Sequence, residues 1–134
     1  MRIVLTAVAT LFLGGCATSW TPAELSAASD DRLCDSFAVV LRYNDQYRTD
    51  LMDEIKRRKL IRSKYQSAVD SGDAKIGMSP IEAVCAWSNP TRINKTTTAN
   101  GVMEQWVFEY GGAVGRPTFN FLYFRDGYVV SIQE

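Results

Sequence analysis

The sequence predicts a single α+β domain. Between residues 30 and 90, apolar residues recur every three or four positions, as they do on the buried face of a helix. After residue 90 they alternate with polar residues, as they do in a half-buried strand. A chain of 134 residues in which helices precede strands is typical of one α+β domain. We expect two or three helices packed on one face of a three- to four-stranded antiparallel meander sheet.

The N-terminal residues have the pattern of a targeting segment. Arg2 provides a positive charge, and the apolar run from Ile3 to Leu13 contains only two polar residues, both threonines. A membrane-spanning helix needs about 20 apolar residues, so this run is too short to span a bilayer. Its length and the small residues after it match a secretory signal. We therefore expect residues 1–15 to be a signal peptide that is removed.

The end of that segment, Leu13-Gly14-Gly15-Cys16, resembles a bacterial lipobox. The resemblance implies that Cys16 becomes the acylated first residue, carrying diacylglycerol and palmitate-type chains that anchor the protein to a membrane. Ala17, in place of aspartate, resembles lipoproteins of the outer membrane, on its periplasmic side. Residues 16–29 would then form a tether, with Thr21-Pro22 as the start of a short helix. An ordinary secreted protein and an uncleaved cytosolic protein are the alternatives.

The next segment is predicted to be helical, over residues 31–43 and 46–59. The first helix carries an apolar face that includes Leu33, Phe37 and Leu41. The second has acidic residues one turn before basic residues, an arrangement that stabilises a helix. Six basic residues then fall between Lys56 and Lys64. This run could contact anionic lipid headgroups, but we favour a solvated helix end balanced by nearby carboxylates.

A third helix has the clearest boundaries. Ser79 has the position of an N-cap, Pro80 takes the first helical position, and Glu82 completes a capping box. Pro90 marks its end. Four strands are predicted after it, at 92–98, 105–110, 119–124 and 128–132. Asn100-Gly101 and Asp126-Gly127 predict hairpin turns between them.

The cysteines suggest one disulfide. With Cys16 lipidated, Cys34 and Cys85 remain, each on the apolar face of a predicted helix. An even number of cysteines in an oxidising compartment favours a bridge between them. Two buried free thiols are the alternative. A redox pair is less favoured because the sequence has no Cys-x-x-Cys and no histidine.

Residues 73–134 resemble the SmpA/OmlA (BamE-like) domain of small outer-membrane lipoproteins, which is related in architecture to β-lactamase inhibitor proteins. In this chain Ser88 occupies a helix-end position where that family often has glycine, so Ser88 or Asn89 must accept a positive φ or the turn must differ. Residues 30–72 would be an added helical part of the same domain, 30–134. The matching motifs are Ile76-Gly77-Met78-Ser79-Pro80, Ala86-Trp87-Ser88-Asn89-Pro90, Gln105-Trp106-Val107-Phe108 and Tyr123 to Ile132.

Composition and resemblance together favour a non-enzymatic binding protein. The chain has no histidine and a formal net charge of +0, which argues against common acid–base catalysis, metal sites and nucleic-acid binding. We expect no cofactor. The resemblance implies a lipid-anchored scaffold in envelope assembly or integrity, acting through contacts with an envelope protein, and Tyr110, Arg116 and Tyr123 are candidate contact residues. The alternative is an inhibitor-type module that inserts the loop 111–117 into an enzyme.

Overall fold

The computed structural model describes residues 19–40, 45–111 and 116–134. Its elements follow the predicted order, helices first and strands last. The helices are α1 (Pro22–Ala27), α2 (Asp30–Val40), α3 (Asp45–Arg57), η1 (Ser63–Tyr65), α4 (Gln66–Ser71) and α5 (Pro80–Trp87). The strands are β1 (Arg92–Thr98), β2 (Gly101–Tyr110), β3 (Thr118–Arg125) and β4 (Tyr128–Gln133).

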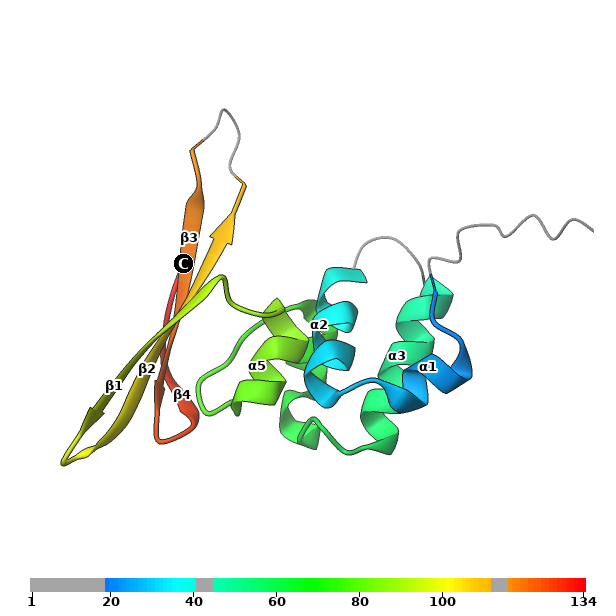
Figure 1. Cartoon of the computed structure of the whole chain (residues 1–134), viewed down its shortest axis with the longest axis horizontal. Coiled ribbons are helices and arrows are strands. Elements are labelled where there is room, and N and C mark those ends of the chain that lie inside the picture. The colour runs from blue at the N-terminus through cyan, green and yellow to red at the C-terminus, as the bar shows by residue number, and fades with distance from the viewer. Residues whose placement is uncertain (1–18, 41–44, 112–115) are drawn as a thin grey trace, which may run out of the picture.

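The four strands form one antiparallel sheet in the order β1-β2-β3-β4, and the helices all lie on one side of it (Figure 1). The predicted α+β class and meander are therefore confirmed. Helix α5 lies closest to the sheet, α2 packs behind it, and α1 and α3 lie at the far end (Figure 1). No helix in the described ranges is both long enough and apolar enough to cross a membrane.

A disulfide joins the two central helices. Cys34 of α2 and Cys85 of α5 are bonded, and both are fully buried. Leu33 and Phe37, on the same face of α2, are also completely buried. The bridge predicted from the cysteine count is confirmed, and it crosslinks the helix next to the sheet to the helix behind it.

Arg58 holds α1 against the rest of the helices. Its guanidinium donates to the backbone oxygens of Leu25, Ser26 and Ala28, and it pairs with Asp30 and Glu54. These oxygens lie at the end of α1, where carbonyl groups have no partner within the helix. Thr21 caps α1 with the predicted capping box. The described part of the expected tether is therefore packed against α3, and a tether before Ser19 stays a prediction.

Glu82 is the one charged residue of the described core, at 1% exposure. Its carboxylate completes the predicted capping box by accepting from the backbone N–H and hydroxyl of Ser79 at 2.8 and 3.1 Å. It also accepts from the backbone N–H and guanidinium of Arg62. Arg62 in turn lies between the rings of Tyr65 and Tyr128. One buried carboxylate thus ties the loop after α3 to α5 and, through Arg62, to β4.

The core continues from α5 into the sheet. Trp87 meets Phe108 edge-on at 5.3 Å between ring centroids, and Trp106 packs on Phe124 at 4.5 Å. The segment before α5 pairs with β4, since Gly77 N–H donates to Val129 O and Val129 N–H donates to Met78 O. Gly77 has a φ of +85°, and a Cβ there would clash with the Tyr65 hydroxyl. The backbone therefore enters α5 through a tight conformation that glycine permits at this position.

Three local features differ from the prediction. Residues 63–71 form the helices η1 and α4, which bury Tyr65 and Val69 although their short apolar pattern gave no clear period. The first hairpin loop is Ala99–Asn100, because Gly101 already pairs with Thr98. Tyr128, Val130 and Ile132, which a strict alternation along the last predicted strand would place on one face, do not share a face.

A bulge explains the last difference. The register shifts between Tyr123 and Phe124, so that Tyr123 pairs with Ser131 while Phe124 pairs with Val129. Val130 is the extra residue and is 46% exposed, whereas Val129 is buried. An extra residue in one strand reverses the alternation beyond it. A strict period of two therefore assigned this strand incorrectly.

Ser88 has a φ of 73° and a ψ of −175° at the end of α5. This backbone region is essentially restricted to glycine and costs another residue about 1–3 kcal/mol. We predict that Ser88→Gly raises the free energy of unfolding by about 1 kcal/mol, since glycine loses more entropy on folding and offsets part of the relief. Denaturant unfolding measures the change. Ser67→Gly, on the exposed side of α4, is the control and should lower stability by about 1 kcal/mol; equal effects of the two would contradict the assignment.

The carboxylates of Glu82 and Glu54 make the stability of the protein depend on pH. Burial raises the pKa of Glu82, but hydrogen bonds from Arg62 and Ser79 outweigh it and the net pKa is lowered. Hydrogen bonds from Arg57 and Arg58 lower the pKa of Glu54 to about 2. Groups with a lowered folded-state pKa stabilise the protein above their unfolded pKa and lose that contribution as pH falls. We predict that stability declines as pH falls from about 4.5 towards about 2.

Glu82→Gln tests the role of this carboxylate directly. It should lower the free energy of unfolding at pH 7 by about 2 kcal/mol, because Arg62 loses its charged acceptor inside the protein while staying partly hydrated. Thermal and urea unfolding at pH 7 and pH 3 measure the loss, which should shrink at pH 3. Glu109→Gln, exposed on β2, is the control and should change little. A variant as stable as the wild type at pH 7 would contradict the role.

Candidate functional site

The two faces of the sheet have different surroundings. On the face towards the helices, Trp106, Phe108, Leu122, Phe124 and Val129 are at most 5% exposed. On the other face, which we call the open face, no helix of the described chain lies over the strands (Figure 1). The cross-strand partners assign the open face to alternate residues of each strand, since directly paired residues point to the same side. The residues of the open face include Arg92, Asn94, Thr96, Met103, Gln105, Val107, Phe119, Phe121, Tyr123, Ser131 and Gln133.

A chain of polar side chains crosses the open face from one edge to the other. Asn94 Nδ2 donates to Gln105 Oε1 at 2.9 Å, and Gln105 Nε2 donates to the Tyr123 hydroxyl at 3.1 Å. The Tyr123 hydroxyl donates to Gln133 Oε1 at 3.2 Å. Each of the four strands contributes one member, so this amide ladder holds the strands in register while leaving amide groups at the surface.

An aromatic ladder runs along β3 beside it. Phe119, Phe121 and Tyr123 follow one another at i, i+2 spacing, and neighbouring ring centroids are 6.4 Å apart with planes inclined by 20° and 29°. Val107 pairs with Phe121 and is only 3% exposed although it belongs to the open face. Phe119 keeps 42% of its surface exposed. The rings therefore form an apolar ridge that covers Val107 and leaves Phe119 partly exposed.

A shallow groove of about 350 Å³ lies next to this ridge, between β1 and β3. Met103, at 40% exposure, provides its most exposed apolar side chain. The amide ladder forms one wall. Aromatic rings, methionine and amides are suited to contact recognition by packing and hydrogen bonding. The groove is lined by Asn94, Thr96, Met103, Glu104, Gln105 and Tyr123.

The candidate contact residues from the sequence do not share one surface. Tyr123 belongs to both ladders of the open face. Tyr110 has the strand parity of Phe108, so it lies on the helix side of the sheet, beyond the core, where burial and the charge of Glu134 raise its pKa. Arg116 is exposed beside residues 112–115, which lie outside the described ranges together with Cys16. Only Tyr123 joins the open-face site.

Sequence reasoning missed Asn94, Gln105 and Gln133, the other members of the amide ladder. Their signal was present only in part, because each has one apolar neighbour in the sequence that points to the other face, Ile93, Trp106 and Ile132, while the second neighbour is charged. What the sequence lacked was the register, which brings the three amides and Tyr123 into line. Polar residues on a solvated face are common, so alternation alone does not single them out.

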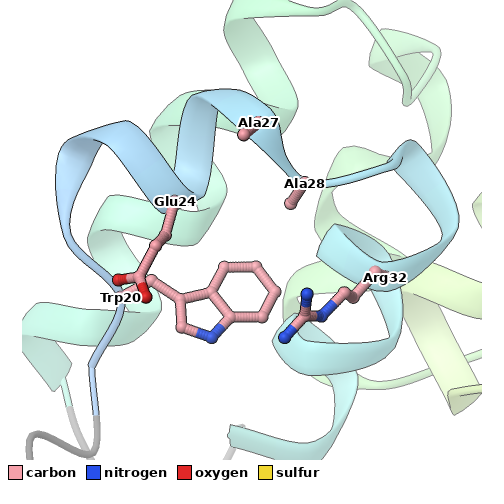
Figure 2. A pocket seen from close by; sticks show the side chains of 5 residues that line it. All are labelled: Trp20, Glu24, Ala27, Ala28 and Arg32. Atoms are coloured by element: carbon pink, nitrogen blue, oxygen red, sulfur yellow. The ribbon is translucent and has the colours of Figure 1, made fainter.

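A second, smaller pocket lies at the start of the described chain. Trp20 packs edge-on against Tyr47, with their ring centroids 6.3 Å apart. The Arg32 guanidinium lies 4.7 Å from the centroid of the Trp20 ring. Figure 2 shows Arg32 of α2 pointing towards the indole from one side, with Glu24 near its other side. Backbone and side-chain hydrogen bonds to Thr21 lower the pKa of Glu24. Trp20 lines this pocket of about 150 Å³ together with Glu24 and Arg32. Both charged groups already have structural contacts, Arg32 with Trp20 and Glu24 with Thr21.

The basic run divides into two groups. Its three arginines pair with carboxylates, Arg57 and Arg58 with Glu54 and Arg62 with Glu82. Its lysines, Lys56, Lys59 and Lys64, form no ion pair with any residue placed by the structure. The predicted balancing by nearby carboxylates is thus present for the arginines, and contact of this run with lipid stays a prediction.

No cluster of three or more potential metal ligands occurs among the residues with described positions. Comparison of the chain with protein-family models, with curated proteins and with solved structures finds no match. The open face exposes aromatic and amide groups from all four strands, and it is the candidate functional site.

The amide ladder gives a testable contribution to stability. Tyr123→Phe removes the hydroxyl that joins Gln105 to Gln133, and we predict a loss of about 1 kcal/mol in the free energy of unfolding. Urea unfolding measures it. Tyr128→Phe is the matched control, since Tyr128 is 53% exposed and its ring contact with Arg62 survives the change. Equal stability of Tyr123→Phe and the wild type would mean that water replaces the ladder without cost.

Proposed function

We propose that this chain is a lipid-anchored, non-enzymatic binding protein on the periplasmic side of the outer membrane, acting in envelope assembly or integrity through the open face of its sheet. The single observation that carries the binding role is the pair of ladders on that face. Together they expose rings and amides across all four strands, and Met103 is exposed beside them. Aromatic residues and methionine are enriched at protein interfaces, and exposed apolar patches of this kind mark interaction sites.

The position of the anchor supports this assignment. Cys16, the proposed lipid site, precedes Trp20 by four residues, so their Cα atoms are at most about 15 Å apart. Trp20 is fixed against Tyr47 and Arg32. Helices α1 and α3 lie at the opposite end of the molecule from the sheet (Figure 1). An anchor at the helical end would leave the open face directed away from the lipid and accessible to a partner.

The disulfide agrees with an oxidising compartment. Bridges of this kind persist in the periplasm and are rare in the cytosol. Cys34 and Cys85 are completely buried, so the bond is protected from solution thiols. The resemblance of residues 73–134 to SmpA/OmlA domains, which suggests envelope assembly, stays part of the proposal. The inhibitor alternative depends on the loop 111–117, of which residues 112–115 lie outside the described ranges.

Site-specific photocrosslinking in cells tests the binding face. We predict that a benzophenone amino acid replacing Phe119 or Met103 forms adducts with the same envelope protein. The control is the same amino acid at Val39, which is 63% exposed on α2 and lies on the helical side. Adducts identified by mass spectrometry should be absent at Val39. Equal adducts from all three positions, or none from the sheet positions, would contradict the proposal.

Fractionation tests the anchor separately. Cys16→Ala removes the thiol that would be acylated, and we predict that the variant no longer sediments with outer membranes. Two or three acyl chains anchor stably because each buried CH₂ contributes about 0.8 kcal/mol, and without them only weak contacts remain. Cys34→Ala/Cys85→Ala is the control, since it removes the other two cysteines, which form the disulfide, but not the lipid site. A Cys16→Ala variant that still sediments with membranes would exclude lipid anchoring through this residue.

A further inference from the structure

The two edges of the sheet differ in how much of their backbone is already hydrogen-bonded. At the β4 edge, Gly77 and Met78 hydrogen-bond to Val129 on both its N–H and its C=O, at 2.7 and 2.9 Å. The segment before α5 therefore already occupies part of that edge. At the other edge, β1 pairs with β2 and with no other strand of the described residues, and every one of its residues is exposed. An edge strand leaves half of its backbone N–H and C=O groups without a ladder partner.

Strand β1 is also unusually regular for an exposed edge. It pairs with β2 over seven consecutive positions, from Arg92 opposite Val107 to Thr98 opposite Gly101, with no register shift. Natural proteins commonly shorten, bulge or cover their edge strands to prevent pairing with other chains. In this sheet the bulge lies at Val130, on the edge that is already partly occupied. The free edge is seven residues long and has no bulge, and its charged residues are Arg92 and Lys95.

The side chains of β1 indicate what kind of strand would fit. On the helix-side face, Ile93 pairs with Trp106 and is 48% exposed, so an apolar side chain from an added strand would cover it. On the open face, Arg92 forms no ion pair within the described ranges. The other charge of β1 is Lys95, whose Nζ lies 3.6 Å from Glu104. The strand carries no acidic residue.

We propose that β1 is a strand-addition site that binds an extended segment of a partner protein with apolar residues on one side and acidic residues on the other. The main chain of the partner would hydrogen-bond to the free edge, which is the usual source of affinity in strand addition. Its apolar side chains would pack beside Ile93 and its carboxylates would meet Arg92. A second copy of this chain fits less well, because two β1 strands would bring only cations together. This inference rests on the proposed function, since it specifies how the same sheet meets its partner.

The test uses the full chain in detergent and an acetylated seven-residue peptide of alternating valine and glutamate. We expect the peptide to bind and to protect the amides of β1, but not those of α2, from hydrogen exchange. The backbone N–H groups of an extended peptide point alternately to its two edges, and only one edge of the added strand meets β1. N-methylation of one set of alternate residues should therefore abolish binding, whereas N-methylation of the other set should preserve it; these two sets are the two phases. Equal effects of the two phases, or no protection of β1, would overturn the proposal.

Charge reversal provides the second arm. Arg92→Glu should weaken binding of the valine–glutamate peptide by at least about tenfold and strengthen binding of a valine–lysine peptide. Arg125→Glu is the matched control, since Arg125 is an exposed arginine on β3, an inner strand, and the change should leave both affinities unaltered. Equal weakening by the two variants, or protection of β1 that depends on protein concentration without peptide, would overturn the proposal.

The outcome is separable from the proposed function. If crosslinks from Phe119 persist while Arg92→Glu changes neither peptide affinity nor those crosslinks, strand addition fails and the open-face assignment stands. If the crosslinks are absent while the peptide still binds in the phase-dependent manner, the partner meets the edge and not the open face. Loss of both would remove the sheet as the binding element.

Discussion

The carboxylate of Glu82 accepts hydrogen bonds from two segments that η1 and α4 separate in the sequence, Ser79 at the start of α5 and Arg62 after α3. A buried charge is costly unless it is fully paired, so the loop between α3 and η1 must follow a course that delivers Arg62 to it. Arg62 then reaches Gly77 O and the rings of Tyr65 and Tyr128. The relative position of helices and sheet thus depends on one completed capping box.

A disulfide and further hydrogen bonds connect the other helices to α5, first α2 and then α1. The Cys34–Cys85 bond fixes α2 against α5, and Asn89, just past α5, donates to the carboxylates of Asp31 and Asp35 on α2. Arg58 then fixes α1 through three backbone oxygens. These covalent and charged contacts therefore connect the region near Trp20, where the proposed lipid anchor would lie, to the sheet. The ends of this path are the two places where the chain meets its surroundings in the proposed function.

In the proposed function, one face of the sheet has a structural role and the other a binding role. One face buries aromatic rings against α5, and the other keeps its rings and amides ordered by bonding them to one another. Surface groups that are already held in place lose little entropy when a partner binds, which favours affinity for a given contact area. An added strand at β1 would extend the open face, because its side chains would continue the rows that begin with Arg92 and Asn94.

The sequence alone determined the elements whose cause is local. The structure contains the capping boxes at Thr21 and Ser79, the prolines after them, the helix periods, the strand alternation before β4, and the disulfide expected from the cysteine count. Short apolar segments without a clear period, such as residues 63–71, gave no such signal, because burial of Tyr65 and Val69 depends on what packs against them.

Only the tertiary structure decided the features that depend on distant residues. Among these are the bulge at Val130, the pairing of Arg62 with Glu82, and the register that aligns Asn94, Gln105, Tyr123 and Gln133. It also placed Tyr110 and Tyr123 on opposite faces, although both looked like exposed strand aromatics. The physical reason is that periodicity specifies which side chains share a face of one element, whereas register and packing specify which elements meet.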